Sequence, residues 1–345
     1  MSPRICIALS WMFLFAVQLQ VSTRLVADDS QLLRIGMIGL DTSHAPAFTE
    51  AINSPKATGH LAKMKVVAAF PGGSDDLQSS YQRVEGFTEK IRGMGVEIVD
   101  SIDALLPKVD VVLLESVDGR KHLPQVLPVF KAGKPVFIDK PLGSNLTEAV
   151  AIDLLGKKFN ARWFSSSSLR FSPSIIRFRE NDELSHGIRA AISWSPCSMD
   201  PTHADLFWYG VHGVESLYTA MGPGCESVTR VDGQDVVVVG KWSDGRLGTY
   251  HGIRGGKSGY GLAIFGEKPI DTDATYSGYQ PLLERIGEFF AGGPLPVSNA
   301  ETIEMFTFMQ AADQSKAAGG APIMLADVLK SATEDATKEI ESLLP

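Results

Sequence analysis

The chain has 345 residues, of which 44% are hydrophobic and 21% charged, so it can bury a large core, and its length favours two domains. The formal net charge is -8, and no block of Lys or Arg offsets it. This charge balance argues against nucleic acid as a partner.

The N-terminal segment is typical of a secretory signal. Arg4 precedes an apolar run over 5–17, and a more polar stretch follows up to Ala27. The run is shorter than the roughly 20 apolar residues that span a bilayer. We therefore expect residues 1–27 to be a cleaved signal peptide, with a retained anchor as the alternative. Because no Arg-Arg pair precedes the run, we expect general secretion to the periplasm or the extracellular space, with no membrane span after cleavage.

The cysteines fit export without proving it. Cys6 leaves with the signal, so Cys197 and Cys225 remain. They can form a disulfide if the fold brings them together, or stay as two buried thiols. Their spacing matches no metal motif.

Buried strands alternate with helices in the first half of the chain. Strands are expected at 33–39, 65–70, 96–99, 111–115 and 136–139, with helices at 45–53 and 122–132. Pro46 lies in the first turn of the first helix, which Asp41 or Ser43 can cap. The alternation predicts an α/β fold whose N-terminal Rossmann domain, residues 33–155, is a doubly wound parallel sheet.

The second half of the chain reads differently. Consecutive strands at 235–242, 246–252 and 261–265 are joined by short turns, and a helix at 279–290 ends before Gly292. We expect residues 156–345 to form an α/β domain with an open, mostly antiparallel sheet. One face of this sheet would serve substrate, and the other would be free to pack on another subunit.

Lys140 is the first candidate catalytic residue. The segment Asp139-Lys140-Pro141 follows the second strand of a strand, helix, strand unit, at the edge where parallel sheets bind ligands. An ammonium there can polarise a substrate hydroxyl or carbonyl. The alternative is a surface lysine before a proline turn.

Several segments occur in a characteristic order: Ile38-Gly39-Leu40 with His44, 109–113, His122, 132–136 and 139–142, followed by Arg170-Phe171-Ser172-Pro173, Gly210-Val211-His212, Ser315 and 322–328. Together they resemble the Gfo/Idh/MocA family, the group of glucose-fructose oxidoreductase and inositol dehydrogenase. The resemblance covers essentially all of the mature chain. It implies NAD or NADP as cofactor, a small-molecule sugar or polyol as substrate, and homo-oligomers formed through the C-terminal sheet.

The resemblance also implies roles for single residues. Lys140 would steady the alkoxide, and His212 would take the hydroxyl proton as hydride leaves the carbon. His122 matches a position near the nicotinamide, and Asp139 replaces the family's glutamate. Arg170, at the start of the second domain, is a candidate substrate contact.

The cofactor fingerprint departs from the family. The three positions that are usually glycine are Gly39, Asp41 and His44, and a carboxylate at the second position would face an anionic pyrophosphate. Two interpretations of the loop compete. Either Asp41 and Ser43 cap the helix and His44 packs at its start, or Thr42 and Ser43 add hydroxyl donors to a helix N-terminus that binds phosphate. A sugar or a metal is a third possible ligand. The predicted cofactor residues are Gly39, Asp41, Thr42, Ser43, His44, His122 and Asp139.

The catalytic half departs as well. Trp208 occupies the position of the acid that orients the histidine in the family. His203 or Asp205 is close enough in sequence to substitute, and Trp208 itself can stack on a sugar ring. A metal site of His203, Asp205 and His212 has suitable ligand types but matches no known spacing, so we predict no metal.

Three functions remain open. The first is an NAD(P)-dependent oxidoreductase that acts on CH-OH groups of a sugar, polyol or sugar-derived alcohol. The second is a cofactor-independent or metal-assisted sugar lyase or hydrolase, and the third is a carbohydrate-binding protein that keeps only the fold. Lys140, His212 and the whole-chain resemblance favour the first function. Export weighs against it, because free dinucleotide is scarce outside the cytoplasm. Substrate identity, the choice of NAD or NADP and oligomer size stay open.

Overall fold

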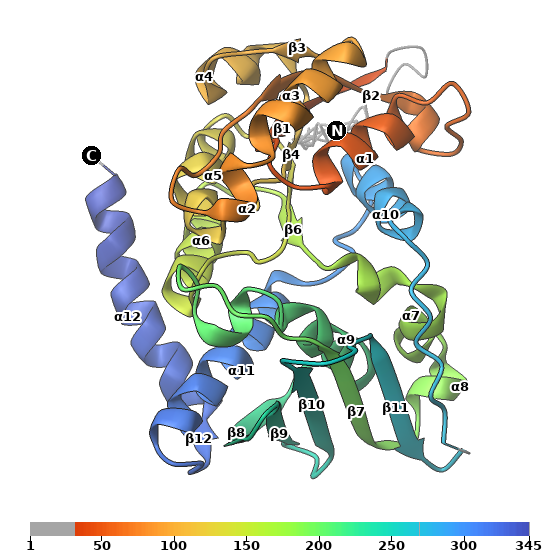
Figure 1. Ribbon diagram of the computed structural model, residues 1–345, viewed down its shortest axis with the longest axis vertical. Helices are drawn as coiled ribbons and strands as arrows, with labels where there is room; N and C mark the ends of the chain where they lie inside the picture. Colours follow the sequence, from red (N-terminus) through yellow and green to blue (C-terminus); the bar gives the residue numbers. More distant parts are fainter. Residues whose placement is uncertain (1–31, 269, 345) are drawn as a thin grey trace, which may run out of the picture. The chain divides into compact units, whose positions relative to one another are not determined.

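The computed structural model describes residues 32–268 and 270–344. The predicted signal peptide, residues 1–27, lies outside this part of the chain. The described residues form one compact unit that contains two sheets (Figure 1).

The first sheet is a doubly wound parallel sheet, as predicted. Its six strands lie in the order β3-β2-β1-β4-β5-β6, and every neighbouring pair is parallel. The strands are β1 (Leu33–Ile38), β2 (Met64–Phe70), β3 (Glu97–Ile98), β4 (Val111–Leu114), β5 (Val136–Ile138) and β6 (Trp163–Ser165). All four residues of β4 and all three of β5 are buried, because helices cover both faces of a parallel sheet. The sequence did not predict β6, which is only three residues long.

The helices associated with this sheet are α1 (His44–Ile52), α2 (Gln78–Tyr81), α3 (Val84–Gly93), α4 (Ile102–Leu105), α5 (His122–Lys131) and α6 (Leu146–Lys158). Neither Asp41 nor Ser43 caps α1 with its side chain; instead the Thr42 hydroxyl accepts a hydrogen bond from the Ala45 backbone N-H at 3.3 Å. Asn145 caps α6 by accepting from the Glu148 N-H at 3.0 Å. The capping prediction for α1 is therefore wrong, and the two polar side chains are free for other contacts.

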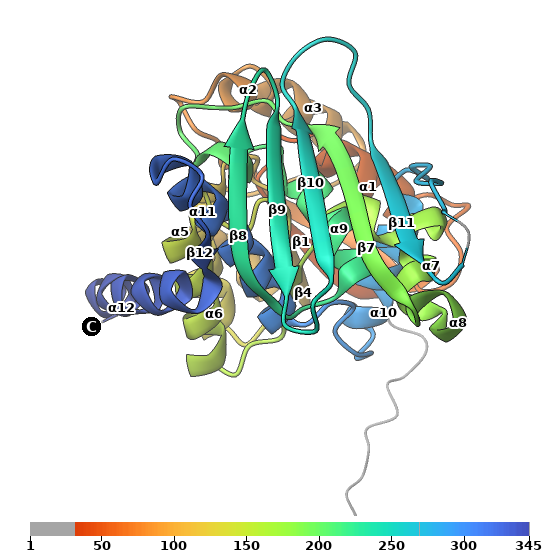
Figure 2. The same ribbon diagram turned by 90° about the horizontal axis from the view of Figure 1, so that it is seen from below.

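The second sheet has the order β11-β7-β10-β9-β8-β12 and is antiparallel except between β7 and β10. Its strands are β7 (Ile188–Pro196), β8 (Cys225–Asp232), β9 (Val236–Trp242), β10 (Leu247–Ile253), β11 (Gly261–Gly266) and β12 (Ile323–Met324). The mostly antiparallel sheet is confirmed. Figure 2 shows that no described helix covers its outer face, but whether this face joins subunits stays a prediction.

The remaining helices are α7 (Pro173–Glu180), α8 (Asp182–Ser185), α9 (Val211–Met221), α10 (Gln280–Phe290), α11 (Asn299–Ala317) and α12 (Leu325–Leu343). Helix α9 lies on the inner face of the second sheet (Figure 1). It approaches closely because Gly213 has no side chain: a Cβ there would lie 2.4 Å from the Tyr250 ring and 2.7 Å from the Ser195 hydroxyl. This contact fixes the depth of the neighbouring His212.

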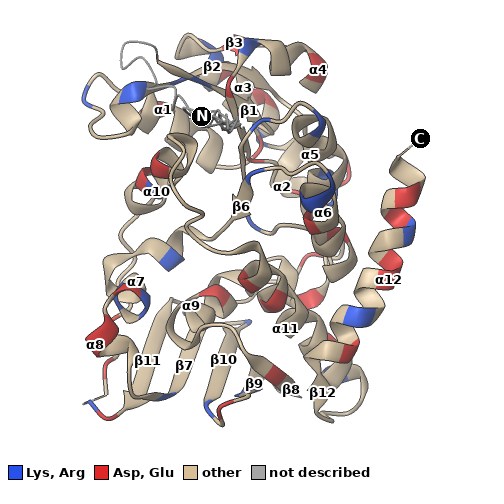
Figure 3. Ribbon diagram, turned by 180° about the vertical axis from the view of Figure 1, so that it is seen from behind, with Lys and Arg blue, Asp and Glu red and all other residues tan. Residues whose placement is uncertain are grey.

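Three sequence expectations can be compared with these elements. Cys197 and Cys225 are both buried free thiols, so they do not pair with each other. No described helix is both long and apolar enough to cross a membrane. Lys and Arg are scattered among Asp and Glu over many elements in the view of Figure 3, rather than gathered on one.

Candidate active site

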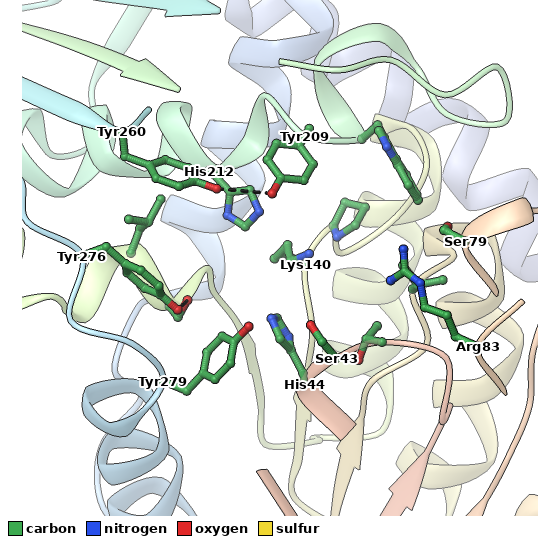
Figure 4. A pocket seen from close by; sticks show the side chains of 16 residues that line it. Ser43, His44, Ser79, Arg83, Lys140, Tyr209, His212, Tyr260, Tyr276 and Tyr279 are labelled. Carbon is green, nitrogen blue, oxygen red and sulfur yellow. Dashed lines mark hydrogen bonds between the residues drawn. The ribbon is translucent and has the colours of Figure 1, made fainter. Parts of the chain in front are cut away.

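A cavity of about 270 Å³ lies where the carboxyl ends of the first sheet face the second half of the chain. Its lining residues come from the segments after β1, β2, β4, β5 and β6, from the first turn of α9 and the residues before it, and from the chain between β10 and α10. They are Thr42, Ser43, His44, Ser79, Arg83, Val117, Lys140, Pro141, Ser168, Leu169, Trp208, Tyr209, His212, Tyr260, Tyr276 and Tyr279. Most of these side chains are drawn and labelled in Figure 4.

The two predicted catalytic residues lie in this cavity. Lys140 follows β5, His212 lies in the first turn of α9, and Figure 4 shows Lys140 between His212 and His44. Burial, together with the charge of Lys140, holds the pKa of His212 well below its usual value. His212 is therefore neutral near pH 7.

A serine takes the place of the acid that should orient His212. The His212 Nδ1 lies 2.7 Å from the Ser167 hydroxyl. The Ser167 backbone N-H donates to Glu215 at 2.8 Å, and Glu215 accepts from the buried Arg170 guanidinium at 2.7 Å. The ion pair of Arg170 and Glu215 thus positions Ser167, and Ser167 in turn orients the His212 ring.

His203 and Asp205, which were predicted to substitute for the orienting acid, bind other residues. The His203 Nε2 accepts from the Gly119 N-H at 3.0 Å, and Asp205 pairs with Arg230 and Arg254. In the described part of the chain, no hydrogen bond or ion pair joins either of these residues to His212, so neither takes the orienting role, and the alternative metal site of His203, Asp205 and His212 is not assembled.

The carboxylate of Asp41 does not face the cavity. Its side chain is fully buried, and its two oxygens accept from the Ser80 hydroxyl at 2.6 Å and from the Val117 N-H at 2.9 Å. Burial raises the pKa of Asp41 despite these hydrogen bonds. Asp41 therefore holds the segments after β2 and β4 together, and the expected repulsion of a pyrophosphate by a facing carboxylate does not arise.

Five predicted residues do not line the cavity. Gly39 and Asp41 pack behind the loop after β1, and a Cβ on Gly39, whose φ is +86°, would lie 2.3 Å from the Ser116 nitrogen. His122 is buried with its ring nitrogens 2.8 Å from the Ser116 carbonyl and 3.2 Å from that of Leu142. Asp139 is buried beneath His44, and Arg170 is 3% exposed and paired with Glu215 and Glu301. The structure thus places these five residues behind the cavity lining, and their roles toward a cofactor or substrate stay predictions.

The predicted residues that do line the cavity are Thr42, Ser43, His44, Trp208, Lys140 and His212. Their proximity follows from topology, because the loops after adjacent parallel strands meet at one edge. Their roles remain predictions.

Sequence reasoning missed Ser79, Arg83 and the tyrosines of the cavity. Four of the seven tyrosines line it: Tyr209, Tyr260, Tyr276 and Tyr279. The hydroxyls of Tyr260 and Tyr209 lie 3.3 Å apart. No local spacing marks these residues, because the chain after β10 reaches the cavity only through the tertiary fold.

The charge of the lining suits an anionic group. Arg83 and Lys140 are cations, and no Asp or Glu is among the described residues that line the cavity. The N-terminus of the nine-residue helix α1, with Thr42 and Ser43 beside it, adds N-H and hydroxyl donors. These groups fit the phosphates of a dinucleotide.

Comparisons with known proteins bear on the fold and on the family that the first half of the chain resembles. Residues 33–165 match the model of the Gfo/Idh/MocA family, described as an oxidoreductase family with an NAD-binding Rossmann fold. No curated protein matches the chain in sequence.

Solved structures share the fold over most of the chain. An oxidoreductase from Thermotoga maritima superposes with a TM-score of 0.70 at 16% identity, covering 87% of this chain and 100% of its own. The scyllo-inositol dehydrogenase of Lactobacillus casei, solved with NAD(H) and scyllo-inositol, gives a TM-score of 0.68 at 13% identity, covering 86% and 100%. The myo-inositol dehydrogenase of the same organism, solved with NAD(H) and myo-inositol, gives 0.67 at 13%, covering 85% and 97%. Residues 33–165 are thus similar to the NAD-binding Rossmann domain of the Gfo/Idh/MocA oxidoreductase family, and the chain shares the fold of these solved dehydrogenases over most of its length.

Proposed function

We propose that the protein transfers hydride between NAD or NADP and a hydroxyl-bearing carbon of a small polyol or sugar. The observation that carries this proposal is that Lys140 and His212 line one cavity with the N-terminal turn of α1, and that no carboxylate among the described residues lines it. The structural likeness to inositol dehydrogenases supports the substrate class.

The dinucleotide would be held by α1 and its neighbours. The N-H groups at the start of α1, the hydroxyls of Thr42 and Ser43, and the Arg83 guanidinium would bind its phosphates. When bound, the nicotinamide ring supplies or accepts the hydride.

Lys140 and His212 would act on the substrate oxygen. The Lys140 ammonium stabilises negative charge on that oxygen as the carbon-hydrogen bond is broken or formed. His212 is neutral and exchanges a proton with the same oxygen, and Ser167 holds the ring at Nδ1. Trp208 and the four tyrosines give the rest of the cavity flat apolar faces with hydroxyl rims, which suits a polyol ring.

We further propose that the protein is exported, on the basis of the signal-like residues 1–27. In that case the dinucleotide must be bound outside the cytoplasm, where it is scarce. The expected result is a mature N-terminus near residue 28 in protein recovered from the periplasm or medium. An intact N-terminus in the cytoplasmic fraction would contradict export.

The test of the enzymatic proposal starts with binding. We expect calorimetric titration with NAD and NADP to show micromolar binding of at least one of them. Arg83→Ala should weaken this binding more than tenfold, whereas Arg189→Ala, far from the cavity on β7, should leave it unchanged. Absorbance at the wavelength of the reduced cofactor then reports turnover on a panel of inositols, sugars and sugar acids. No binding at millimolar dinucleotide would refute the proposal and favour cofactor-free recognition of a carbohydrate.

A further inference from the structure

Three side chains with metal-ligand atoms converge under the cavity. They are His44 at the start of α1, Glu115 directly after β4 and Asp139 directly after β5. One nitrogen or oxygen atom of each lies within 4.8 Å of the others. The His44 Nδ1 is 2.7 Å from Asp139 Oδ2 and 3.8 Å from Glu115 Oε2.

The two carboxylates are not satisfied by the protein. Both side chains are fully buried, and Glu115 Oε1, Glu115 Oε2 and Asp139 Oδ1 have no hydrogen-bond partner among the described residues. Buried polar atoms are almost always paired, and an orphaned group signals a missing water or ion. Burial, with the charge of Asp139 beside it, raises the pKa of Glu115 well above its usual value, so without a cation the protein does not stabilise both carboxylates as anions.

We propose that His44, Glu115 and Asp139 bind a divalent transition-metal ion, with zinc as the best match. One imidazole nitrogen and two carboxylate groups are a donor set that zinc accepts, and three protein ligands leave a fourth position open. Zinc bonds of about 2.1 Å in a tetrahedron separate the ligand atoms by roughly 3.4 Å. The observed separations of 2.7 and 3.8 Å lie on either side of this value, so small side-chain rotations complete the site.

The site has a defined proton balance. Without metal, the His44 Nδ1-H donates to Asp139. A metal ion takes the place of this proton, because only the deprotonated nitrogen is a ligand. When the ion binds at Nδ1, the proton moves to Nε2 of the same ring, and the neutral imidazole is the ligand.

The position of the ion follows from its ligands. His44 lines the cavity beside Lys140, whereas Glu115 and Asp139 lie below it. The ion would join α1 to the ends of β4 and β5 at the cavity floor. This inference is independent of the proposed hydride transfer, because its test measures the metal and not turnover.

The experiment uses untagged protein, stripped with chelator and dialysed. Titration with Zn²⁺ is expected to show one equivalent bound. Co²⁺ in place of Zn²⁺ should give the visible absorption of a four-coordinate ion. Mn²⁺ and Mg²⁺ serve as comparisons and should bind more weakly.

Two variants and a control decide the assignment. Glu115→Gln and His44→Phe should each lower zinc affinity at least tenfold, and zinc should raise the melting temperature of the parent protein but not of either variant. Glu148→Gln removes another carboxylate near the first sheet and should bind zinc as the parent does. Absence of zinc binding by the parent, or unchanged binding by Glu115→Gln, would overturn the proposal. Absence of zinc binding by the parent protein would mean that a proton on Glu115 balances the charge. Unchanged zinc binding by Glu115→Gln would place the metal elsewhere.

Discussion

His203 should make the stability of the protein depend on pH between about 6.5 and 4. Its ring is buried and neutral: Nε2 accepts from the Gly119 N-H at 3.0 Å, and Nδ1 lies 2.8 Å from the Thr202 hydroxyl, which donates to Asp200. Burial lowers the pKa of His203 to about 4, although Asp118 and Asp200 act in the opposite direction. Protonation of Nε2 would break the hydrogen bond from the Gly119 N-H, because Nε2 could no longer accept it.

The sign and size of this pH dependence follow from the difference in proton binding between the folded and the unfolded chain. Below pH 6.5 the unfolded chain takes up a proton on His203, and the folded chain does not until pH approaches 4. The unfolding free energy should therefore fall as the pH falls across this window. The fall of the His203 pKa from about 6.5 in the unfolded chain to about 4 in the folded chain, at roughly 1.4 kcal/mol for each tenfold change, gives a loss of about 3.5 kcal/mol.

Urea unfolding followed by fluorescence at pH 7.0, 5.5 and 4.5 measures this loss. Carboxylates also titrate in the window, so the informative quantity is the difference between the parent protein and His203→Gln. The variant should lose most of the slope, whereas the exposed-site control His60→Gln should keep it. Equal slopes in the parent and His203→Gln would refute the assignment of a neutral, accepting His203.

Three further predictions test the roles assigned above. Lys140→Met should lower kcat about 10²- to 10³-fold in the hydride-transfer assay while dinucleotide binding persists by calorimetry, and an unchanged kcat would remove Lys140 from catalysis. Arg170→Met leaves Glu215 buried without its main partner and should cost about 3–5 kcal/mol in urea unfolding; a change confined to KM with no loss of stability would restore the substrate role. Gly213→Ala places a Cβ 2.4 Å from the Tyr250 ring and should cost about 1–3 kcal/mol, seen as a lower melting temperature, with unchanged melting arguing against close packing of α9.

The first sheet was predictable because its strands are short apolar runs separated by helices and turns. Strand β7 was not, since it contains Ala, Ser and Arg among its apolar residues and has no strong strand signal. Its parallel pairing with β10 joins segments more than fifty residues apart, which no local pattern encodes.

The site was predictable where topology alone brings residues together. Lys140 and the segment from Thr42 to His44 follow strands of one parallel sheet, so their meeting in a cavity could be inferred. The direction in which Asp41 points could not, because it depends on Ser80 and Val117, which come from two other loops. The same holds for the serine that replaces the acid at His212.

In the sequence, the acid in the cofactor fingerprint suggests repulsion of a dinucleotide, whereas in the structure that acid does not face the cavity. Asp41, Glu115 and Asp139 are all fully buried and none lines the cavity, whereas Arg83 and Lys140 do. A chain with a net charge of -8 thus presents a cavity whose charged lining residues are cations. Burying a carboxylate costs free energy. For Asp41, the hydrogen bonds from Ser80 and Val117 offset this cost. For Glu115 and Asp139, beneath His44, the described residues supply too few hydrogen-bond partners. This is why we propose a metal ion there and not a lost cofactor site.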